Sequence, residues 1–307
     1  MKFYRLIFIS LSCFIAASGA EQEEELNIEI PEPKTPGLDI HGVLDVSVKN
    51  DYITPRGLLV TNTGVTIQVL SILSFDVYAN PKGWLNKATL FVGAWNDIWT
   101  KQDNPTVGAW NELDWFAGVN FTFARNWKFG VQFLAFLSPP GNFKAEDNIE
   151  FILAYDDSSS GYPIAFNPYV KFFWALSGSS TIVTGKPGGT FDIEIGAIPT
   201  YNLSKQIALK APTWITVGPA SFWNGGDLGL KHEKKNFGVF STGLRGDLQL
   251  AFIPSRFGRW NFYVGAQYYY LINKNLVHAQ ETTLKPVSHR FGYRNVYVGY
   301  AGIGMEY

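Results

Sequence analysis

The chain has 307 residues, a formal net charge of −1 and a single cysteine, Cys13. A charge so close to neutral argues against a nucleic-acid-binding protein, which needs a basic surface. One cysteine excludes a disulfide scaffold and a thiolate metal centre. No stretch after residue 20 is long and apolar enough for a transmembrane helix.

Residues 1–20 have the organisation of an export signal. Two basic residues precede an apolar run, and Ser18-Gly19-Ala20 offers small residues for cleavage. Residues 21–37 then form an acidic extension rich in proline and glutamate. Such a segment cannot bury much apolar area, so we predict a disordered periplasmic extension.

From residue 38 onward the chain alternates as transmembrane β-strands do. Over residues 112–123 apolar side chains such as Trp115 alternate with polar or small ones, and residues 127–138 resume the pattern after a short turn. Each run is long enough for a tilted strand, which needs about 9 to 11 residues to cross a bilayer. The pair predicts a transmembrane hairpin.

The same pattern recurs to the end of the chain and predicts an all-β fold, a twelve-stranded antiparallel up-and-down barrel spanning residues 38–307. The expected strands are 38–49, 64–78, 87–96, 112–123, 127–138, 148–156, 169–176, 190–198, 207–217, 238–253, 260–271 and 295–307. An even count places both termini on the periplasmic side. Pro212 interrupts the ninth strand, because proline removes a ladder donor.

Aromatic residues mark the ends of these strands. The final strand ends on Tyr307, which we predict to be a signal for the barrel-assembly machinery. Tryptophans near the strand ends predict two interfacial girdles. They are Trp84, Trp127 and Trp260 at the inner ends, and Trp95, Trp115, Trp174 and Trp223 at the outer ends.

Charged residues of the strands share one parity, which predicts that they face the lumen. The candidate pore-lining residues are Asp45, Asp76, Glu112, Asp114, Lys128, Glu150, Lys171, Asp192, Glu194, Arg245 and Asp247. The acidic excess among them favours a pore that prefers cations or polar neutral solutes, with Glu112, Asp114 and Glu150 setting the selectivity. The alternative is that acids and bases pair across the interior and brace a barrel with no wide channel.

No residues in the sequence suggest catalysis, a metal or a cofactor. The four histidines lack metal-ligand spacing, and Ser288 and His289, adjacent in a strand, would point to opposite faces. The predicted outer loops are basic, which leaves two interpretations: solvated charge, or contact with the phosphates of lipopolysaccharide. These residues are Lys231, Lys234, Lys235, Lys274, Lys285 and Arg290.

Several short motifs resemble those of the TorF-type porin family. They are residues 92–97 (VGAWND), 112–118 (ELDWFAG) and 150–154 (EFILA), with Asp51-Tyr52 before Arg56-Gly57 in the first loop. The loop has one extra residue here, and Leu58-Leu59 replace a polar residue. The resemblance covers residues 38–200 and implies an outer-membrane barrel of the porin type, without catalytic residues.

These observations predict a bacterial outer-membrane channel for passive diffusion of small hydrophilic solutes, with the lipid bilayer as its surroundings. One alternative is a non-conducting barrel that acts as an adhesin or strengthens the envelope. A third is an outer-membrane hydrolase, or a periplasmic β-sandwich that binds carbohydrate through its aromatics.

Overall fold

The computed structural model describes residues 39–101, 108–177, 179–180, 186–187, 189–220, 222–223, 235–284 and 288–307. The predicted export signal and acidic extension lie outside these residues.

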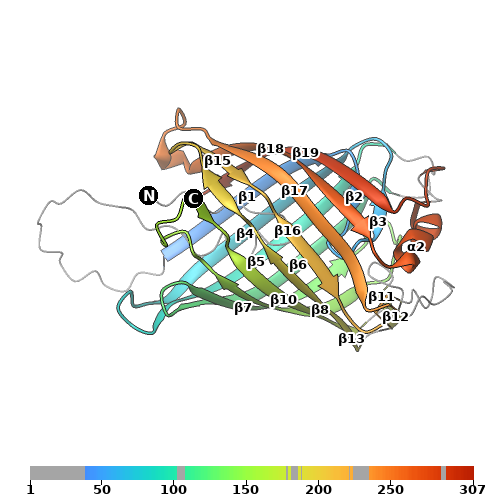
Figure 1. Ribbon diagram of the computed structural model, residues 1–307, viewed down its shortest axis with the longest axis horizontal. Coiled ribbons are helices and arrows are strands. Elements are labelled where there is room, and N and C mark those ends of the chain that lie inside the picture. Colours follow the sequence, from blue (N-terminus) through green and yellow to red (C-terminus); the bar gives the residue numbers. More distant parts are fainter. Residues whose placement is uncertain are drawn as a thin grey trace, which may run out of the picture.

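The long strands form one closed antiparallel barrel in which each strand pairs with its neighbours in the chain (Figure 1). They are β1 (Asp39–Lys49), β4 (Thr66–Ala79), β5 (Leu85–Trp99), β6 (Trp110–Phe123), β7 (Trp127–Leu137), β8 (Glu146–Tyr155), β10 (Pro168–Ser177), β13 (Thr190–Ala197), β16 (Thr213–Val217), β17 (Phe237–Gln249), β18 (Arg259–Leu271) and β19 (Asn295–Glu306). Pairing of β1 with β19 brings the two ends of the sheet together. Tyr307 extends this seam, because its backbone exchanges two hydrogen bonds with Gly42.

Three neighbouring strands are interrupted near one end of the barrel. The short strands β9 (Ile164–Ala165), β14 (Thr200–Asn202) and β15 (Ile207–Lys210) continue β10, β13 and β16 beyond the breaks. A proline lies at each break: Pro168, Pro199 and Pro212. Proline cannot donate to the ladder, which explains why the pairing shifts there. The predicted barrel of twelve spanning strands is therefore confirmed, as is the interruption of the ninth strand at Pro212.

The outer surface of the barrel is apolar. Exposed side chains on this surface include Leu73, Leu90, Val92, Leu153, Val170, Ile195, Leu244, Phe262, Val264 and Ile303. A continuous apolar belt around a closed barrel is suited to the hydrocarbon of a bilayer and costly in water. The barrel is thus a transmembrane barrel.

Among the described residues, no helix combines the length and the apolar character needed to cross a bilayer.

The tryptophan prediction is correct only in part. Trp84, Trp115, Trp127 and Trp174 are exposed, as an interfacial ring requires. Trp95 and Trp223 are buried, so assigning them to the outer girdle was wrong. Trp95 falls on the inner parity of β5 together with Phe91 and Trp99. Trp223 packs edge-on against the buried Phe222, which in turn contacts Phe173.

Two segments between strands lie at one end of the barrel, which we call the outer end; at the opposite, inner end β1 begins and β19 ends (Figure 1). Loop 1, residues 50–65, contains the short strands β2 (Tyr52–Ile53) and β3 (Leu59–Thr61). Residues 272–294 contain the helix α2 (Lys274–Leu284), which packs against β3. Thr283 Oγ1 donates to the Leu59 carbonyl at 2.8 Å. No periodicity in the sequence indicated this helix or the inward course of loop 1.

These two segments enclose an apolar core at the outer end. Buried members from loop 1, α2 and residues 222–223 pack with aromatic residues of the strands. They include Leu58, Leu59, Leu276, Leu284, Phe222, Trp223, Phe136, Phe173 and Tyr269. The lumen is therefore occupied at this end.

Two glycines of β19 provide a matched test of interior packing. A Cβ at Gly302 would overlap the ring of Tyr263 and come within 2.7 Å of the Val46 carbonyl oxygen, whereas a Cβ at Gly299 would meet nothing closer than 3.8 Å. We expect Gly302→Ala to lower the free energy of unfolding by about 1 to 3 kcal/mol through overpacking. Gly299→Ala should change it by less than about 0.5 kcal/mol. Urea unfolding in detergent measures both, and equal stability of the two variants would contradict the packing.

Candidate functional site: the charged interior

The interior of the barrel carries the charged residues that parity predicted. All eleven candidates lie on the inner side of their strands, where alternate positions are buried while their neighbours are exposed or partly exposed. Most are fully buried, including Asp45, Glu112, Lys128, Glu150, Lys171, Asp192, Glu194, Arg245 and Asp247. Asp76 and Asp114 are half-buried. Charges in such surroundings are stable only when they are paired or hydrogen-bonded, so their partners determine what each can do.

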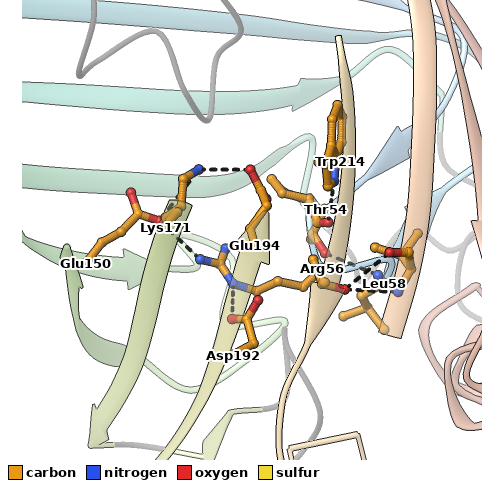
Figure 2. A network of polar contacts seen from close by, with 11 residues as sticks. Thr54, Arg56, Leu58, Glu150, Lys171, Asp192, Glu194 and Trp214 are labelled. Atoms are coloured by element: carbon orange, nitrogen blue, oxygen red, sulfur yellow. Dashed lines mark hydrogen bonds and ion pairs between the residues drawn. The ribbon is translucent and has the colours of Figure 1, made fainter. Parts of the chain in front are cut away.

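An arginine from loop 1 reaches the far wall of the barrel. Arg56 Nε donates to Asp192 Oδ1 at 3.1 Å, and Nη2 donates to Glu150 Oε2 at 3.3 Å (Figure 2). The guanidinium carbon also lies 3.5 Å from the centroid of the Phe173 ring. The three partners belong to β13, β8 and β10. One side chain therefore ties loop 1 to three adjacent strands.

The local fold of loop 1 presents this arginine. Thr54 N donates to the Leu58 carbonyl at 2.9 Å, and Leu58 N donates to Thr54 Oγ1 at 3.1 Å, so residues 54–58 form a tight turn. Gly57 has a φ of 89°, a conformation that glycine adopts at little cost. A Cβ there would also lie 2.9 Å from Leu276 Cδ1 of α2. The turn thus fixes Arg56 at its tip while its other side packs against the helix.

Lys171 extends the same network across the wall. Its Nζ lies 3.8 Å from Glu150 Oε2 and 3.6 Å from Glu194 Oε1 (Figure 2). The Tyr169 hydroxyl donates a hydrogen bond to Glu194 Oε1 at 2.8 Å, and Gln132 Nε2 donates one to Glu150 Oε1 at 2.7 Å. We call the group Arg56, Glu150, Lys171, Asp192 and Glu194 the latch network. Its three carboxylates are shared between two cations, so most of its charge is compensated internally.

A second network lies on the wall formed by β15, β17, β18, β19 and β1. Arg245 donates to Asp247 Oδ1 through Nε at 3.0 Å and through Nη2 at 2.6 Å, and Lys210 Nζ lies 3.3 Å from Asp247 Oδ2. The Arg245 guanidinium carbon is 3.7 Å from the Tyr263 ring centroid, and Tyr263 donates to Asp45 at 2.7 Å. Acids and bases are paired here, which braces this wall.

The carboxylates near the outer end of β5, β6 and β8 differ from both networks. Asp97, Glu112, Asp114 and Glu146 form what we call the acidic arc. Within the described part of the chain, none of Asp97, Glu112 and Asp114 has a lysine or arginine nitrogen within 4.0 Å, unlike the carboxylates of the latch network. Asp114 experiences repulsion from the other three acids. The acidic excess of the interior is concentrated at this arc.

Neutral donors hold two members of the arc. Asp97 accepts from Thr66, from Gln68 Nε2 at 3.2 Å, from Trp99 Nε1 at 2.6 Å and from Asn111 Nδ2 at 3.3 Å. Tyr52 of loop 1 donates to Glu112 Oε2 at 2.9 Å. Loop 1 therefore contacts the acidic arc with one side chain and the latch network with another.

Three of the predicted pore-lining residues have charged partners near them in the structure. Lys128 lies on β7, between β6 and β8 and close to the inner end, and its Nζ contacts Asp156 Oδ2 at 2.8 Å. Glu150, expected to act with Glu112 and Asp114, is instead partnered by Arg56 and Lys171. Asp76 is bound by Lys87 at 2.7 Å and by His41 at 2.9 Å.

Sequence reasoning missed four residues of this interior. Asp97 and Glu146 fell just outside the expected strands 87–96 and 148–156, whereas β5 and β8 extend to include both. Continuing the alternation of Phe91 and Trp95 by one more step would have placed Asp97 inside. Arg56 and Tyr52 lie in loop 1, where no period of two identifies the inner side.

The Lys128–Asp156 pair makes the inner end sensitive to acid. Burial alone would raise the pKa of Asp156, but the charge of Lys128 and hydrogen bonds from Lys128 and Ser158 outweigh it and lower that pKa to about 2. Because the folded pKa lies below that of an unfolded aspartate, the pair stabilises the barrel above about pH 4 and is lost as the pH falls towards 2. Asp156→Asn should remove about 1 to 2 kcal/mol of stability at pH 7. Urea titrations measure the free energy of unfolding of wild type and variant at each pH. The difference between the two proteins should be smaller at pH 3 than at pH 7, and an equal difference at both pH values would contradict the assignment.

Other candidate sites do not assemble. Among the described residues, no group of three or more His, Cys, Asp or Glu is arranged to hold a metal ion. Ser288 is buried while His289 is exposed. Of the basic outer-loop residues, Lys235, Lys274 and Arg290 are exposed, and Lys231, Lys234 and Lys285 lie outside the described residues.

Comparison with known proteins adds fold similarity only. No protein-family model matches the sequence, and no curated protein matches it. Among solved structures, an outer-membrane channel from Pseudomonas putida F1 is 10% identical, with a TM-score of 0.48, over 91% of this chain and 100% of that one. The NanC porin is 12% identical, with a TM-score of 0.44, over 85% and 98%. The translocator domain of the autotransporter NalP from Neisseria meningitidis is 12% identical, with a TM-score of 0.36, over 89% and 90%.

Proposed function

We propose that this chain is a bacterial outer-membrane channel through which small hydrophilic solutes diffuse passively, constricted by loop 1. The observation that carries the proposal is the charged interior: acids and bases line the closed barrel from Asp76 near the inner end to Asp97 near the outer end. Burying ion pairs is seldom more stabilising than apolar packing of the same volume. A charged interior is therefore better explained by solutes that cross it than by stability alone.

Loop 1 narrows this route. The latch network is almost completely buried, with Lys171 only 2% and Asp192 only 1% exposed. Arg56 of loop 1 thus covers this wall of the lumen while loop 1 is in place. We propose that loop 1 moves away from the β8–β10–β13 wall when a solute passes, and that conductance is low while Arg56 remains bound.

Three further features belong to the same proposal. The acidic arc favours cations. Tyr307, which completes the β1–β19 seam, serves the barrel-assembly machinery after export through a cleaved signal. Exposed basic residues at the outer end contact lipopolysaccharide phosphates. The motifs shared with the TorF-type porin family support a porin of this kind, and no residue is assigned a catalytic role.

One observation favours a second function. The apolar core of loop 1, α2 and residues 222–223 occupies the outer end. A barrel closed in this way would suit a non-conducting adhesin or envelope protein.

Planar-bilayer recordings of the folded protein separate the two functions. We expect small, discrete conductance steps that disappear when the protein is boiled before insertion. Folding is checked by the shift in gel mobility on boiling. A heat-modifiable barrel that inserts and never conducts, with or without an applied voltage, would overturn the channel and leave the non-conducting function.

A further inference from the structure

Two members of the acidic arc, Glu112 and Asp114, have few donors for the acceptors that they present, whereas Asp97 accepts four hydrogen bonds. Asp114 Oδ1 is buried and has no hydrogen-bond partner. Glu112 accepts a hydrogen bond from the Tyr52 hydroxyl, and the Glu112 and Asp114 side chains are also hydrogen-bonded to each other. A buried acceptor without a partner costs about 1 to 3 kcal/mol. Repulsion from Asp97, Glu112 and Glu146 adds to the cost of ionised Asp114. A cation that donates hydrogen bonds would relieve both.

Two neutral side chains beside the arc independently indicate a ligand with hydrogen-bonding groups. Gln68 is 1% exposed; its Nε2 holds Asp97, and its Oε1 has no donor. Trp95 is 7% exposed and directly opposite Asp114 in the β5–β6 ladder, and its Nε1 has no acceptor. Buried polar side chains normally satisfy these atoms. Here they adjoin two carboxylates of the arc, Asp97 and Asp114.

Aromatic rings complete the surroundings of the arc. The Tyr52 and Trp95 rings have centroids 5.5 Å apart. Ring faces attract ammonium groups, and tryptophan does so most strongly. The described residues hold no group of three or more His, Cys, Asp or Glu suited to a metal ion, and aromatic faces suit a weakly hydrated organic cation better than a strongly hydrated inorganic one. Carboxylates beside aromatic faces therefore favour an organic ammonium.

We propose that the acidic arc binds the primary ammonium group of a small organic cation, such as a diamine. This rests on the proposed function, because the ligand reaches the arc through the lumen. The ammonium takes the position of the Tyr52 hydroxyl on Glu112 and also donates to Asp114, while the Trp95 and Tyr52 rings flank its alkyl chain. Tyr52 thus occupies the site when loop 1 is closed, and the cation occupies it when the loop moves.

Isothermal titration calorimetry of the folded, detergent-solubilised protein tests this without requiring conductance. The probes are putrescine, which has two ammonium groups, and 1,4-butanediol, its neutral counterpart. Putrescine should bind and butanediol should not. Glu112→Gln combined with Asp114→Asn should weaken putrescine binding at least tenfold, and Tyr52→Phe, which removes the competing hydroxyl, should strengthen it. Asp147→Asn is the matched control, because Asp147 is next to Glu146 but exposed.

If the double variant does not fold, Asp114→Asn alone keeps the experiment decisive, because it removes the carboxylate while the asparagine amide can still hydrogen-bond to Glu112. Absence of putrescine binding, equal binding of butanediol, or unchanged affinity in the arc variant would overturn the site. Binding without conductance would support the site and reject the channel. Conductance without putrescine binding would support the channel and reject the site.

Discussion

Arg56→Ala is expected to raise the conductance of the channel and the fraction of time that it is open. The substitution removes the contacts of loop 1 with Asp192 and Glu150 and its stacking on Phe173. Loss of one partner of a buried ion pair typically costs about 3 to 5 kcal/mol. A shift of only about 1.4 kcal/mol against the closed position changes the ratio of open to closed channels tenfold. Single-channel recordings at fixed voltage measure this ratio.

Two variants control for changes in charge and folding. Arg259→Ala removes a cation that is bound to Glu306 at 2.8 Å at the inner end, away from loop 1, and should leave gating unchanged. Arg56→Lys keeps the charge but cannot reproduce the forked contact with two carboxylates, so an intermediate effect is expected. If Arg56→Ala folds and conducts as the wild type does, loop 1 is not the constriction.

The strands could be predicted because a barrel imposes a period of two on every crossing. Lipid on one side of the strand and charged neighbours on the other determine that residues such as Glu150 and Lys171 face the lumen. A tertiary contact could turn one of them outward only by turning every side chain of its strand to the other face. The ends of strands are not fixed in this way. Asp97 was missed for that reason, although the ladder continues through it to Trp99.

Loop 1 could not be predicted because its position depends on tertiary contacts. Arg56 lies near Asp192 only because Gly57 packs against Leu276 of α2 and because β13 is adjacent to β10. The contacts of Arg56 with Asp192 and of Gly57 with Leu276 join segments more than a hundred residues apart and leave no local pattern. The sequence therefore predicted an acidic interior but could not show which acids are compensated. Arg56 and Lys171 compensate Glu150, whereas Glu112 is held by a neutral tyrosine.

That difference predicts where ion selectivity resides. Glu112→Gln combined with Asp114→Asn should lower the preference for cations several-fold in reversal-potential measurements at low salt, where screening is weak. Glu150→Gln should change the reversal potential less, because the cations that adjoin it already reduce its field. It should cost more stability, because Arg56 and Lys171 lose a buried partner.

Measuring both quantities on both variants separates the two roles. The arc variant should move selectivity with little change in the urea midpoint, and Glu150→Gln should do the opposite, with Asp147→Asn moving neither. Charges act more strongly in a narrow lumen of low dielectric constant than at an open surface. Among the described residues, Glu112 and Asp114 have no lysine or arginine nitrogen within 4.0 Å, whereas the carboxylates of the latch network do. We therefore expect the arc to determine ion selectivity more strongly, even though the latch network holds more charged groups. Greater loss of selectivity in Glu150→Gln than in the arc variant would show that the latch network, and not the arc, determines which ions pass.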